Sequence, residues 1–183
     1  MEQPGIIMEY KTDKINGMLG MYEKKFAKIK DNEIKYFEIG VHNGGSLLWA
    51  SDYFSHKDSK IYGIDINIET QESGRVSTFF CNQDDTVKLQ GLGRVYGKFD
   101  IIIDDGCHFA KETKNCFENL WQYLKSGGWY IIEDWSACYS DIKCESMDKV
   151  IAEILLDAKN YGITEIEIIC GAEEGTYAIF RKK

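Results

Sequence analysis

Residues 98–106, KFDIIIDDG, decide the fold of this chain. Three consecutive isoleucines run into two aspartates and a glycine, which is typical of a buried strand that stops at charged side chains. A strand with nearly continuous apolar residues is covered on both faces, as in a parallel sheet. Because ligands bind at the carboxyl edge of such sheets, we expect the chemistry of this protein next to Asp104 and Asp105.

Strand and helix patterns alternate on both sides of this strand. Strands are expected within 34–41, 59–66, 75–85, 98–106 and 129–135, helices within 14–29, 44–54, 111–124 and 146–162, and a closing hairpin from 164–170 and 175–183. Strands that alternate with helices predict an α/β fold with a doubly wound sheet. The hairpin adds an antiparallel edge to that sheet.

The length and the amino-acid composition are typical of one globular domain. The chain has 183 residues, of which 44% are hydrophobic and 28% are charged. We expect a single domain, 1–183, in which the helical segment within residues 1–32 packs on or caps the core. The net charge of −8 argues against nucleic acid or an anionic membrane as the main partner, since both require clustered Lys and Arg. A small molecule or a glycan suits this charge better.

The cysteines and the lack of long apolar runs indicate the compartment. The six cysteines include no CxxC pair, and no secretory segment precedes them. No run approaches the roughly 18 apolar residues that span a bilayer. We therefore expect a soluble cytoplasmic protein with reduced thiols.

A glycine-bearing loop follows the first strand. EIGVHNGGS, residues 38–46, lies between a strand and a helix, where backbone N–H groups and missing β-carbons allow a nucleotide-type ligand to approach. His42 stands where a dinucleotide fingerprint needs glycine. Asp65, at the end of the second strand, is placed to accept hydrogen bonds from two ribose hydroxyls. Gln83 and Asp84 end the third strand, where they either read another edge of the ligand or only cap the next helix. Together these features predict a nucleoside pocket.

Two strands that we expect to be neighbours both end in acids. Asp104 and Asp105 end one strand, and Glu133 and Asp134 end the next. Four carboxylates at one edge repel one another unless a cation joins them. Oxygen ligands suit a hard divalent ion, above all Mg²⁺. The alternative for any single acid pair is a solvated strand end.

His108 follows Asp105 by three residues and can face the same cleft. A neutral imidazole is the usual base for taking a proton at physiological pH. We therefore expect His108 to be the catalytic base. His42 and His56 have no such setting, and we interpret them as loop and surface residues.

Segments along most of the chain, from Tyr10 to Tyr139, resemble a known family. YKTDK, YEKKF, FEIGVHNGGSLLWASDYF, IYGIDI, NQDD, FDIIIDDGCHF, LKSGGWYIIEDW and CYSD resemble, in order and spacing, the class I S-adenosylmethionine-dependent methyltransferases related to the metal-dependent sugar O-methyltransferases of macrolide biosynthesis. The most specific parts are DDGCH and IIEDW. Cys107 differs from the family, whose members usually have serine there. Those relatives often carry further segments for substrate capping and oligomer assembly, whereas we expect this chain to hold the core domain alone.

The resemblance implies a Rossmann-like seven-stranded sheet, mostly parallel with an antiparallel C-terminal hairpin and helices on both faces. It implies S-adenosyl-L-methionine as methyl donor, Mg²⁺ or another divalent cation bound by Asp105, Glu133 and Asp134, and His108 as the base. The expected cofactor-binding residues are Glu38, Gly40, Asn43, Gly44, Ser46, Asp65, Gln83, Asp84 and Asp104. The expected reaction is methylation of a hydroxyl of a sugar, of a sugar-containing natural product or of a polysaccharide.

Other functions remain open at this point. A nucleotide-dependent oxidoreductase would use the same type of sheet, although His42 and the acidic strand ends argue against it. A non-catalytic nucleoside-binding domain would keep the pocket, although intact Asp105, His108, Glu133 and Asp134 together argue against that. A small diol or catechol-like acceptor would replace the sugar equally well. The sequence also leaves open whether the chain forms a homo-oligomer.

Overall fold

The computed structural model describes residues 10, 12, 14, 16–68, 71–137, 146–171 and 175–183. Predictions that fall on Ile15, on Cys138 and Cys144, or on the CYSD motif lie outside these residues. The strands are β1 (Lys35–Ile39), β2 (Lys60–Asp65), β3 (Gln71–Ser73), β4 (Val76–Phe80), β5 (Phe99–Asp104), β6 (Leu124–Glu133), β7 (Ile163–Gly171) and β8 (Gly175–Lys182). The helices are α2 (Asn16–Phe26), α3 (Gly45–Tyr53), α4 (Thr86–Tyr96), α5 (Ala110–Leu120), α6 (Asp148–Leu156) and α7 (Ala158–Tyr161), with short 3₁₀ turns at Ala27–Ile29 and Trp121–Tyr123.

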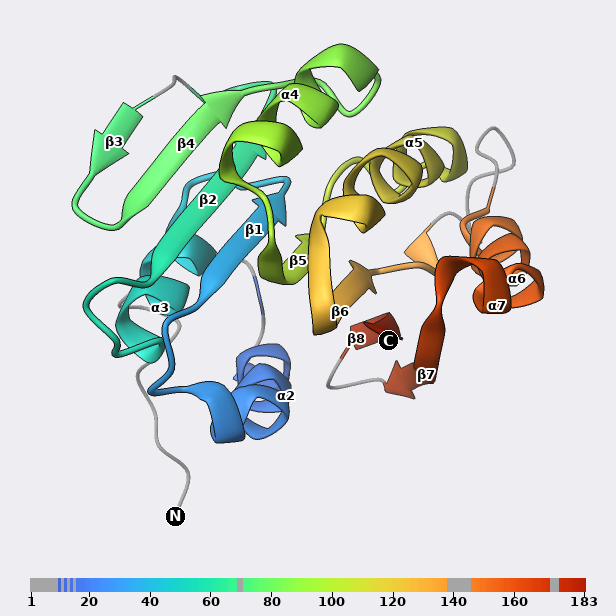
Figure 1. The fold of residues 1–183 in the computed structure, drawn as a ribbon, viewed down its shortest axis with the longest axis horizontal. Helices are drawn as coiled ribbons and strands as arrows, with labels where there is room; N and C mark the ends of the chain where they lie inside the picture. The colour runs from blue at the N-terminus through green and yellow to red at the C-terminus, as the bar shows by residue number, and fades with distance from the viewer. Residues whose placement is uncertain are drawn as a thin grey trace.

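The described strands form one sheet in the order β3-β4-β2-β1-β5-β6-β8-β7 (Figure 1). Strands β4, β2, β1, β5 and β6 run parallel, and β8 pairs antiparallel with both β6 and β7. The predicted mostly parallel sheet with its antiparallel C-terminal hairpin is therefore confirmed. The short β3, which pairs antiparallel with β4, is an addition to the seven predicted strands.

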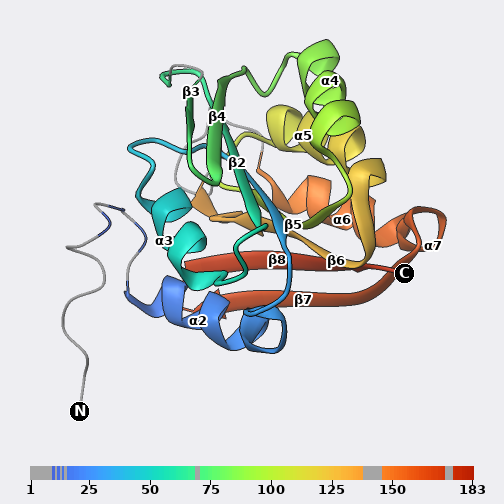
Figure 2. The same ribbon diagram turned by 60° about the vertical axis from the view of Figure 1, so that its left-hand side comes forward.

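Helices cover both faces of the sheet (Figure 2). Helices α2 and α3 pack on one face, where Tyr22 and Phe26 join a cluster that includes Ile101 and Ile103 of β5. Helices α4, α5 and α6 pack on the other face, where Ile102 belongs to a second cluster. Since side chains alternate along a strand, the unbroken apolar run of β5 serves both faces at once. This explains why the run does not alternate with polar residues.

Three elements differ from the expected pattern. Helix α4 was allowed for only as a helix after the third strand, without bounds, because its two glycines lower its intrinsic helix propensity. Gly93 is needed there, since a Cβ would lie 2.2 Å from the Tyr123 ring. Strand β6 begins at Leu124, earlier than the apolar pattern suggests. The predicted helix within 146–162 is divided into α6 and α7 at Asp157, and it ends at Gly162, whose φ of 68° is left-handed.

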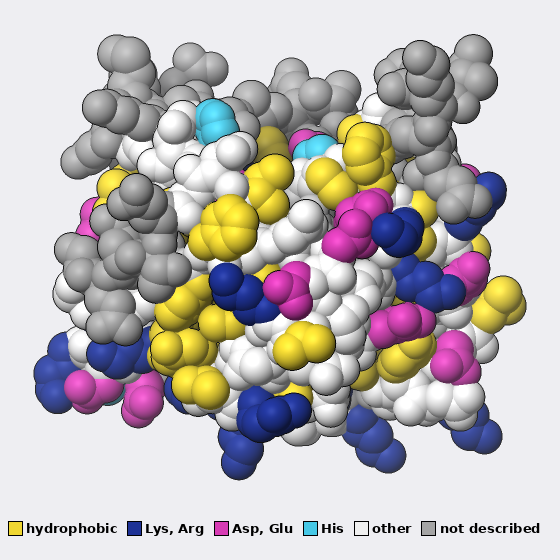
Figure 3. All heavy atoms as spheres, turned by 90° about the horizontal axis from the view of Figure 1, so that it is seen from above, with side chains coloured by type: hydrophobic (Ala, Val, Ile, Leu, Met, Phe, Trp, Pro, Cys, Tyr) yellow, Lys and Arg dark blue, Asp and Glu magenta, His cyan; other side chains and the backbone are white. Residues whose placement is uncertain are grey.

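Among the residues that the structure describes, no helix has both the length and the apolar character that a membrane span requires. On the face shown in Figure 3, acidic and basic side chains are interspersed.

Candidate active site at the switch between β1 and β5

The site lies where the order of the strands reverses. From β1 the chain continues outward to β2 and β4, and it then returns to β5 on the other side of β1. The backbone N–H of Asp105 donates to the carbonyl oxygen of Ile39 at 2.9 Å, which joins the carboxyl ends of β1 and β5. In doubly wound sheets the loops diverge at this point and leave a crevice for a ligand.

Two glycines shape the loop between β1 and α3. Gly40 has a φ of 83°, and a Cβ there would lie 1.9 Å from the carbonyl oxygen of Asp105. Only glycine therefore allows the two loops to approach this closely. Gly44, with a φ of 79°, is the N-cap of α3, and nothing lies within 4 Å of its missing Cβ. The loop thus presents open backbone at the start of a helix, which favours an anionic or polar ligand group.

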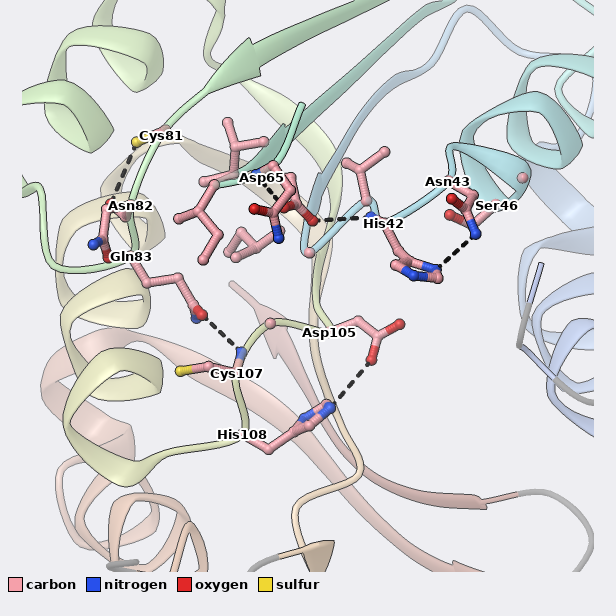
Figure 4. Close-up of a pocket in the computed structure, with 18 of the residues that line it drawn as sticks. His42, Asn43, Ser46, Asp65, Cys81, Asn82, Gln83, Asp105, Cys107 and His108 are labelled. Atoms are coloured by element: carbon pink, nitrogen blue, oxygen red, sulfur yellow. Dashed lines mark hydrogen bonds and ion pairs between the residues drawn. The ribbon is translucent and has the colours of Figure 1, made fainter. Parts of the chain in front are cut away.

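A cavity of about 340 Å³ opens between these loops (Figure 4). Five predicted cofactor-binding residues line it, and so do Asp105 and His108. Those five are Gly40, Asn43, Ser46, Asp65 and Gln83. The volume is at the small end of the range for small-molecule sites.

Asp65 is held in place by backbone donors on both of its oxygens. Oδ2 accepts from the N–H of His42 at 2.9 Å, and Oδ1 accepts from the N–H of Asn67 at 2.8 Å (Figure 4). Each carboxylate oxygen has a second lone pair. The half-buried carboxylate can therefore still accept hydrogen bonds from a diol in the cavity.

Gln83 links the end of β4 to the end of β5. Its Oε1 accepts from the N–H of Cys107 at 2.8 Å, and its Nε2 donates to Oδ1 of Asp104 at 3.2 Å. A Cβ at Gly106 would lie 2.2 Å from Gln83 Oε1, so this contact also depends on a glycine. The amide is buried, with 8% of the residue exposed.

The other predicted cofactor residues are not among the residues that line this cavity. Glu38 is fully buried and accepts a hydrogen bond from the Tyr36 hydroxyl at 2.8 Å. Asp84 is exposed and lies 3.0 Å from the ammonium group of Lys111. Gly44 is the N-cap residue of α3.

Asp104 also lies outside the lining, buried next to Gln83 and Tyr130. Its Oδ2 accepts from the Tyr130 hydroxyl at 3.1 Å. Burial raises the pKa of Asp104 to about 7. A cofactor role for Asp104 and for the other three residues outside the lining stays a prediction.

Three side chains at the acidic strand ends form a compact cluster. Asp105, His108 and Asp134 each offer a ligand atom, and these atoms lie within 4.8 Å of one another. His108 Nε2 is 3.8 Å from Asp105 Oδ1, and Figure 4 shows the two side chains facing each other. His108 and Asp134 both have left-handed φ values, 59° and 49°. Such backbone strain in residues other than glycine is characteristic of functional sites.

Glu133 is directed elsewhere. Its Oε1 accepts from the ammonium group of Lys14 at 2.8 Å and from the hydroxyl of Tyr22. Lys14 also lies 2.5 Å from Oδ2 of Asp105 and 3.5 Å from Oε1 of Glu38. The structure therefore brings all three predicted metal ligands to adjoining strand ends, but it groups Asp105 and Asp134 with His108 and pairs Glu133 with a lysine. The metal set of Asp105, Glu133 and Asp134 stays a prediction.

Burial and charge shift the pKa values of this cluster. Burial, and then the charge of Glu133, raise the pKa of Asp105, although Lys14 opposes this. Burial likewise raises the pKa of Glu133 against the opposing effect of Lys14. Burial alone would lower the pKa of Lys14, but Glu133, Glu38 and Asp105 raise it well above its ordinary value. The lysine is therefore held as an ammonium ion.

The residues present fit a divalent cation. The carboxylates of Asp105 and Asp134 are the oxygen ligands that a hard divalent ion such as Mg²⁺ prefers. In addition, Oε2 of Glu133 is buried and has no hydrogen-bond partner within the described parts of the chain. A buried carboxylate oxygen without a donor is costly, and a cation would satisfy it.

Sequence reasoning missed Lys14, Tyr22 and His42. His42 is a loop residue as predicted, yet it also lines the cavity, and its position two residues after Gly40 was the signal for this. Tyr22 was recognised only as an apolar position of a helix. Nothing in the local sequence marks Lys14, because its partners are 91 and 119 residues away.

The chain is similar to known methyltransferases. A family model described as "Methyltransferase domain" matches residues 37–135, just over half of the chain. The chain is 36% identical over 126 residues to demethylmacrocin O-methyltransferase of Streptomyces fradiae, covering 63% of this chain and 31% of that protein. It is 32% identical over 145 residues to 8-demethyl-8-alpha-L-rhamnosyl tetracenomycin-C 2'-O-methyltransferase of Streptomyces olivaceus, covering 74% of this chain and 38% of that protein.

A solved structure is similar over nearly the whole chain. It is MycE methyltransferase from the mycinamycin biosynthetic pathway, in complex with Mg, SAH and mycinamycin VI. The TM-score is 0.82 at 25% identity, and the match covers 97% of this chain and 53% of that one. The chain spans about a third of the length of the curated relatives described above. On the match over residues 37–135, the chain belongs to the methyltransferase domain family.

Proposed function

We propose that this protein is an S-adenosylmethionine-dependent O-methyltransferase that uses Mg²⁺ or another divalent cation. Its acceptor is a hydroxyl of a sugar, in a sugar-containing natural product or a polysaccharide. The relatives named for sugar-bearing substrates and the structure solved with Mg and SAH support this assignment.

One observation carries the proposal: Asp105 and His108 belong both to the cavity lining and to the acidic cluster. The place for a donor and the place for a cation therefore share one rim. A methyltransferase that activates its acceptor with a metal requires this adjacency, whereas a nucleoside-binding domain does not.

The donor would be held by the residues that line the cavity. Asp65 would accept hydrogen bonds from the ribose hydroxyls, and the loop from Gly40 to Ser46 would approach the rest of the molecule. The bound donor supplies a methyl group on a positively charged sulfur. The close approach of Gly40 to Asp105 keeps this loop next to the acidic cluster.

The cation would be held by Asp105 and Asp134, with Glu133 as the predicted third ligand. When bound, it supplies Lewis-acid chemistry that makes an acceptor hydroxyl easier to deprotonate. His108 Nε2 would take the proton of that hydroxyl as the oxygen bonds to the methyl carbon. The bond between this carbon and the donor sulfur breaks in the same step, and neutral adenosylhomocysteine leaves. Asp105, 3.8 Å from the imidazole, orients the ring and stabilises its protonated form.

The partners and the compartment follow from the same features. The proposed acceptor is a small molecule or glycan, and the net charge of −8 makes nucleic acid and anionic membranes poor partners. The described cysteines, Cys81, Cys107, Cys116 and Cys170, are free. A cytoplasmic location stays a prediction.

The test is a transfer assay. Purified protein, Mg²⁺ and S-adenosylmethionine labelled in the methyl group are incubated with a panel of glycosylated macrolides, glycosylated aromatic polyketides, free deoxysugar nucleotides and catechols. Label is expected in a sugar-bearing acceptor. Transfer only to catechols would overturn the sugar assignment. Calorimetry in the same buffer compares the binding of adenosylhomocysteine with the binding of NAD. Tight binding of NAD without binding of adenosylhomocysteine would exclude the methyltransferase function.

A further inference from the structure

Lys14 lies among the carboxylates that are proposed to bind the metal. Its ammonium nitrogen is 2.5 Å from Oδ2 of Asp105 and 2.8 Å from Oε1 of Glu133, and only 3% of its side chain is exposed. It reaches these oxygens from the N-terminal segment, 91 and 119 residues away in sequence. The buried ammonium group of Lys14 therefore occupies the position of a cation between two proposed metal ligands.

The surroundings of the ammonium group are acidic. Glu38 lies 3.5 Å from it, and the hydroxyl of Tyr22 donates to the same Glu133 oxygen that Lys14 contacts. The other oxygen of Glu133, Oε2, has no hydrogen-bond partner in the described structure. One positive charge thus faces three carboxyl groups, which a divalent cation in its place would neutralise more fully.

A metal ion and the ammonium group need the same oxygens. Mg²⁺ binds oxygen at about 2.0–2.1 Å, so an ion shared by Asp105 and Glu133 would compete for the lone pairs that now face Lys14. Two cations on one oxygen pair also repel each other strongly where water is excluded. The two arrangements therefore exclude each other.

We propose that Lys14 is a positioning residue that holds Asp105 and Glu133 together in the metal-free protein and leaves them when a divalent cation binds. The inference rests on the proposed function, because it requires that a metal binds here. The ammonium group keeps the buried carboxylates paired before the metal arrives. It also lowers the apparent affinity for the metal, since binding must displace it.

The first experiment titrates Mg²⁺ into three proteins by calorimetry in the absence of donor and acceptor. Lys14→Met removes the competing charge and should bind Mg²⁺ more tightly than wild type, by on the order of tenfold or more. Lys25→Met is the matched control, because Lys25 pairs with Glu167 away from the cluster, and it should bind Mg²⁺ like wild type. Unchanged or weaker binding by Lys14→Met would overturn the proposal.

The second experiment uses wild-type protein, so it does not depend on the stability of a variant. An amine-reactive acetylating reagent is added with and without saturating Mg²⁺ at constant ionic strength, and labelled peptides are quantified by mass spectrometry. Labelling of Lys14 should rise severalfold in Mg²⁺, because the side chain leaves its buried partners, while labelling of Lys25 should not change. Equal labelling of Lys14 in both conditions, with Mg²⁺ bound, would overturn the displacement.

The two experiments also separate the two proposals. If wild type binds Mg²⁺ and Lys14 does not respond, the metal site stands and the role of Lys14 falls. If neither wild type nor Lys14→Met binds Mg²⁺ or Mn²⁺, the metal site itself is wrong, and the inference fails with it.

Discussion

On the donor side of the site, the carboxylate of Asp65 is held by backbone N–H groups of His42 and Asn67. On the acidic side, the carboxylate of Glu133 is held by the side chains of Lys14 and Tyr22, 119 and 111 residues away. Backbone donors at a strand end are fixed by the fold itself. The long side chains of Lys14 and Tyr22 can rearrange, so the proposed donor pocket is preformed, whereas the arrangement of the acidic half is proposed to depend on which cation it holds.

The largest effect should come from removing the metal. In EDTA, methyl transfer should fall to background and should return when Mg²⁺ is added in excess, because the acceptor hydroxyl is no longer activated. Adenosylhomocysteine binding, measured by calorimetry in the same EDTA buffer, should remain largely unchanged. Full turnover in exhaustively chelated enzyme would mean that the reaction needs no metal. The acidic half of the site would then not depend on a metal cation.

The loss of the base should be the next largest. His108→Ala should lower the transfer rate by roughly 10²- to 10⁴-fold, the usual contribution of a general base. Donor affinity should barely change, because Asp65 and the glycine loop are untouched. His56→Ala, in the loop after α3, serves as the control. Near-normal turnover by His108→Ala would assign the proton to another group.

The donor half can be tested through Asp65. Asp65→Ala should weaken donor binding by roughly 1.5–3 kcal/mol, the scale of a hydrogen bond to a charged group. Asp84→Ala is the matched control, since Asp84 is exposed and paired with Lys111 rather than lining the cavity. No loss of donor affinity in Asp65→Ala would mean that the cavity is not the donor site. A loss in Asp84→Ala as large as that in Asp65→Ala would support the predicted role of Asp84.

The smallest effect should be a change in the free energy of unfolding when Glu133 loses its hydrogen bond from Tyr22. Tyr22→Phe removes one of the two donors to Oε1 and should lower the free energy of unfolding by about 1 kcal/mol in EDTA. Saturating Mg²⁺ should narrow that difference, because the metal then satisfies the carboxylate. Tyr53→Phe, whose hydroxyl donates to the Glu23 carbonyl oxygen, should show no dependence on Mg²⁺ in urea unfolding. A deficit for Tyr22→Phe that Mg²⁺ does not change would mean that Glu133 is not a ligand.

The sequence could predict the features that depend on local patterns, but not those that depend on contacts between distant residues. The strand that ends at Asp104 is visible because its apolar run is local, and its parallel pairing follows from the alternation of strands and helices. The bounds of helix α4 could not be predicted, because Gly93 lowers its helix propensity. A glycine is needed at this position because the Tyr123 ring packs against it, and only the folded structure reveals that contact. Strand β3 is too short for a periodic pattern.

In the site, residues that act through their own loop were found, such as Gly40 and Asp65. Lys14 was not found, because its partners come from β1, β5 and β6 and no spacing in the sequence joins them. Glu38 was assigned to the pocket by its place in the loop. Glu38 is not among the residues that line the cavity, and its carboxylate contacts Tyr36 and Lys14, so its cofactor role stays a prediction.

The contact between Gly40 and Asp105 also limits how this domain can be engineered. Any side chain at position 40 would press on the backbone of Asp105 and disturb both ligand sites in one step. Libraries that aim at new acceptors should therefore keep position 40 constant and vary exposed residues that adjoin lining residues in sequence, such as Phe109 after His108. Acceptor preference could then change while the spacing between donor and metal is inherited intact.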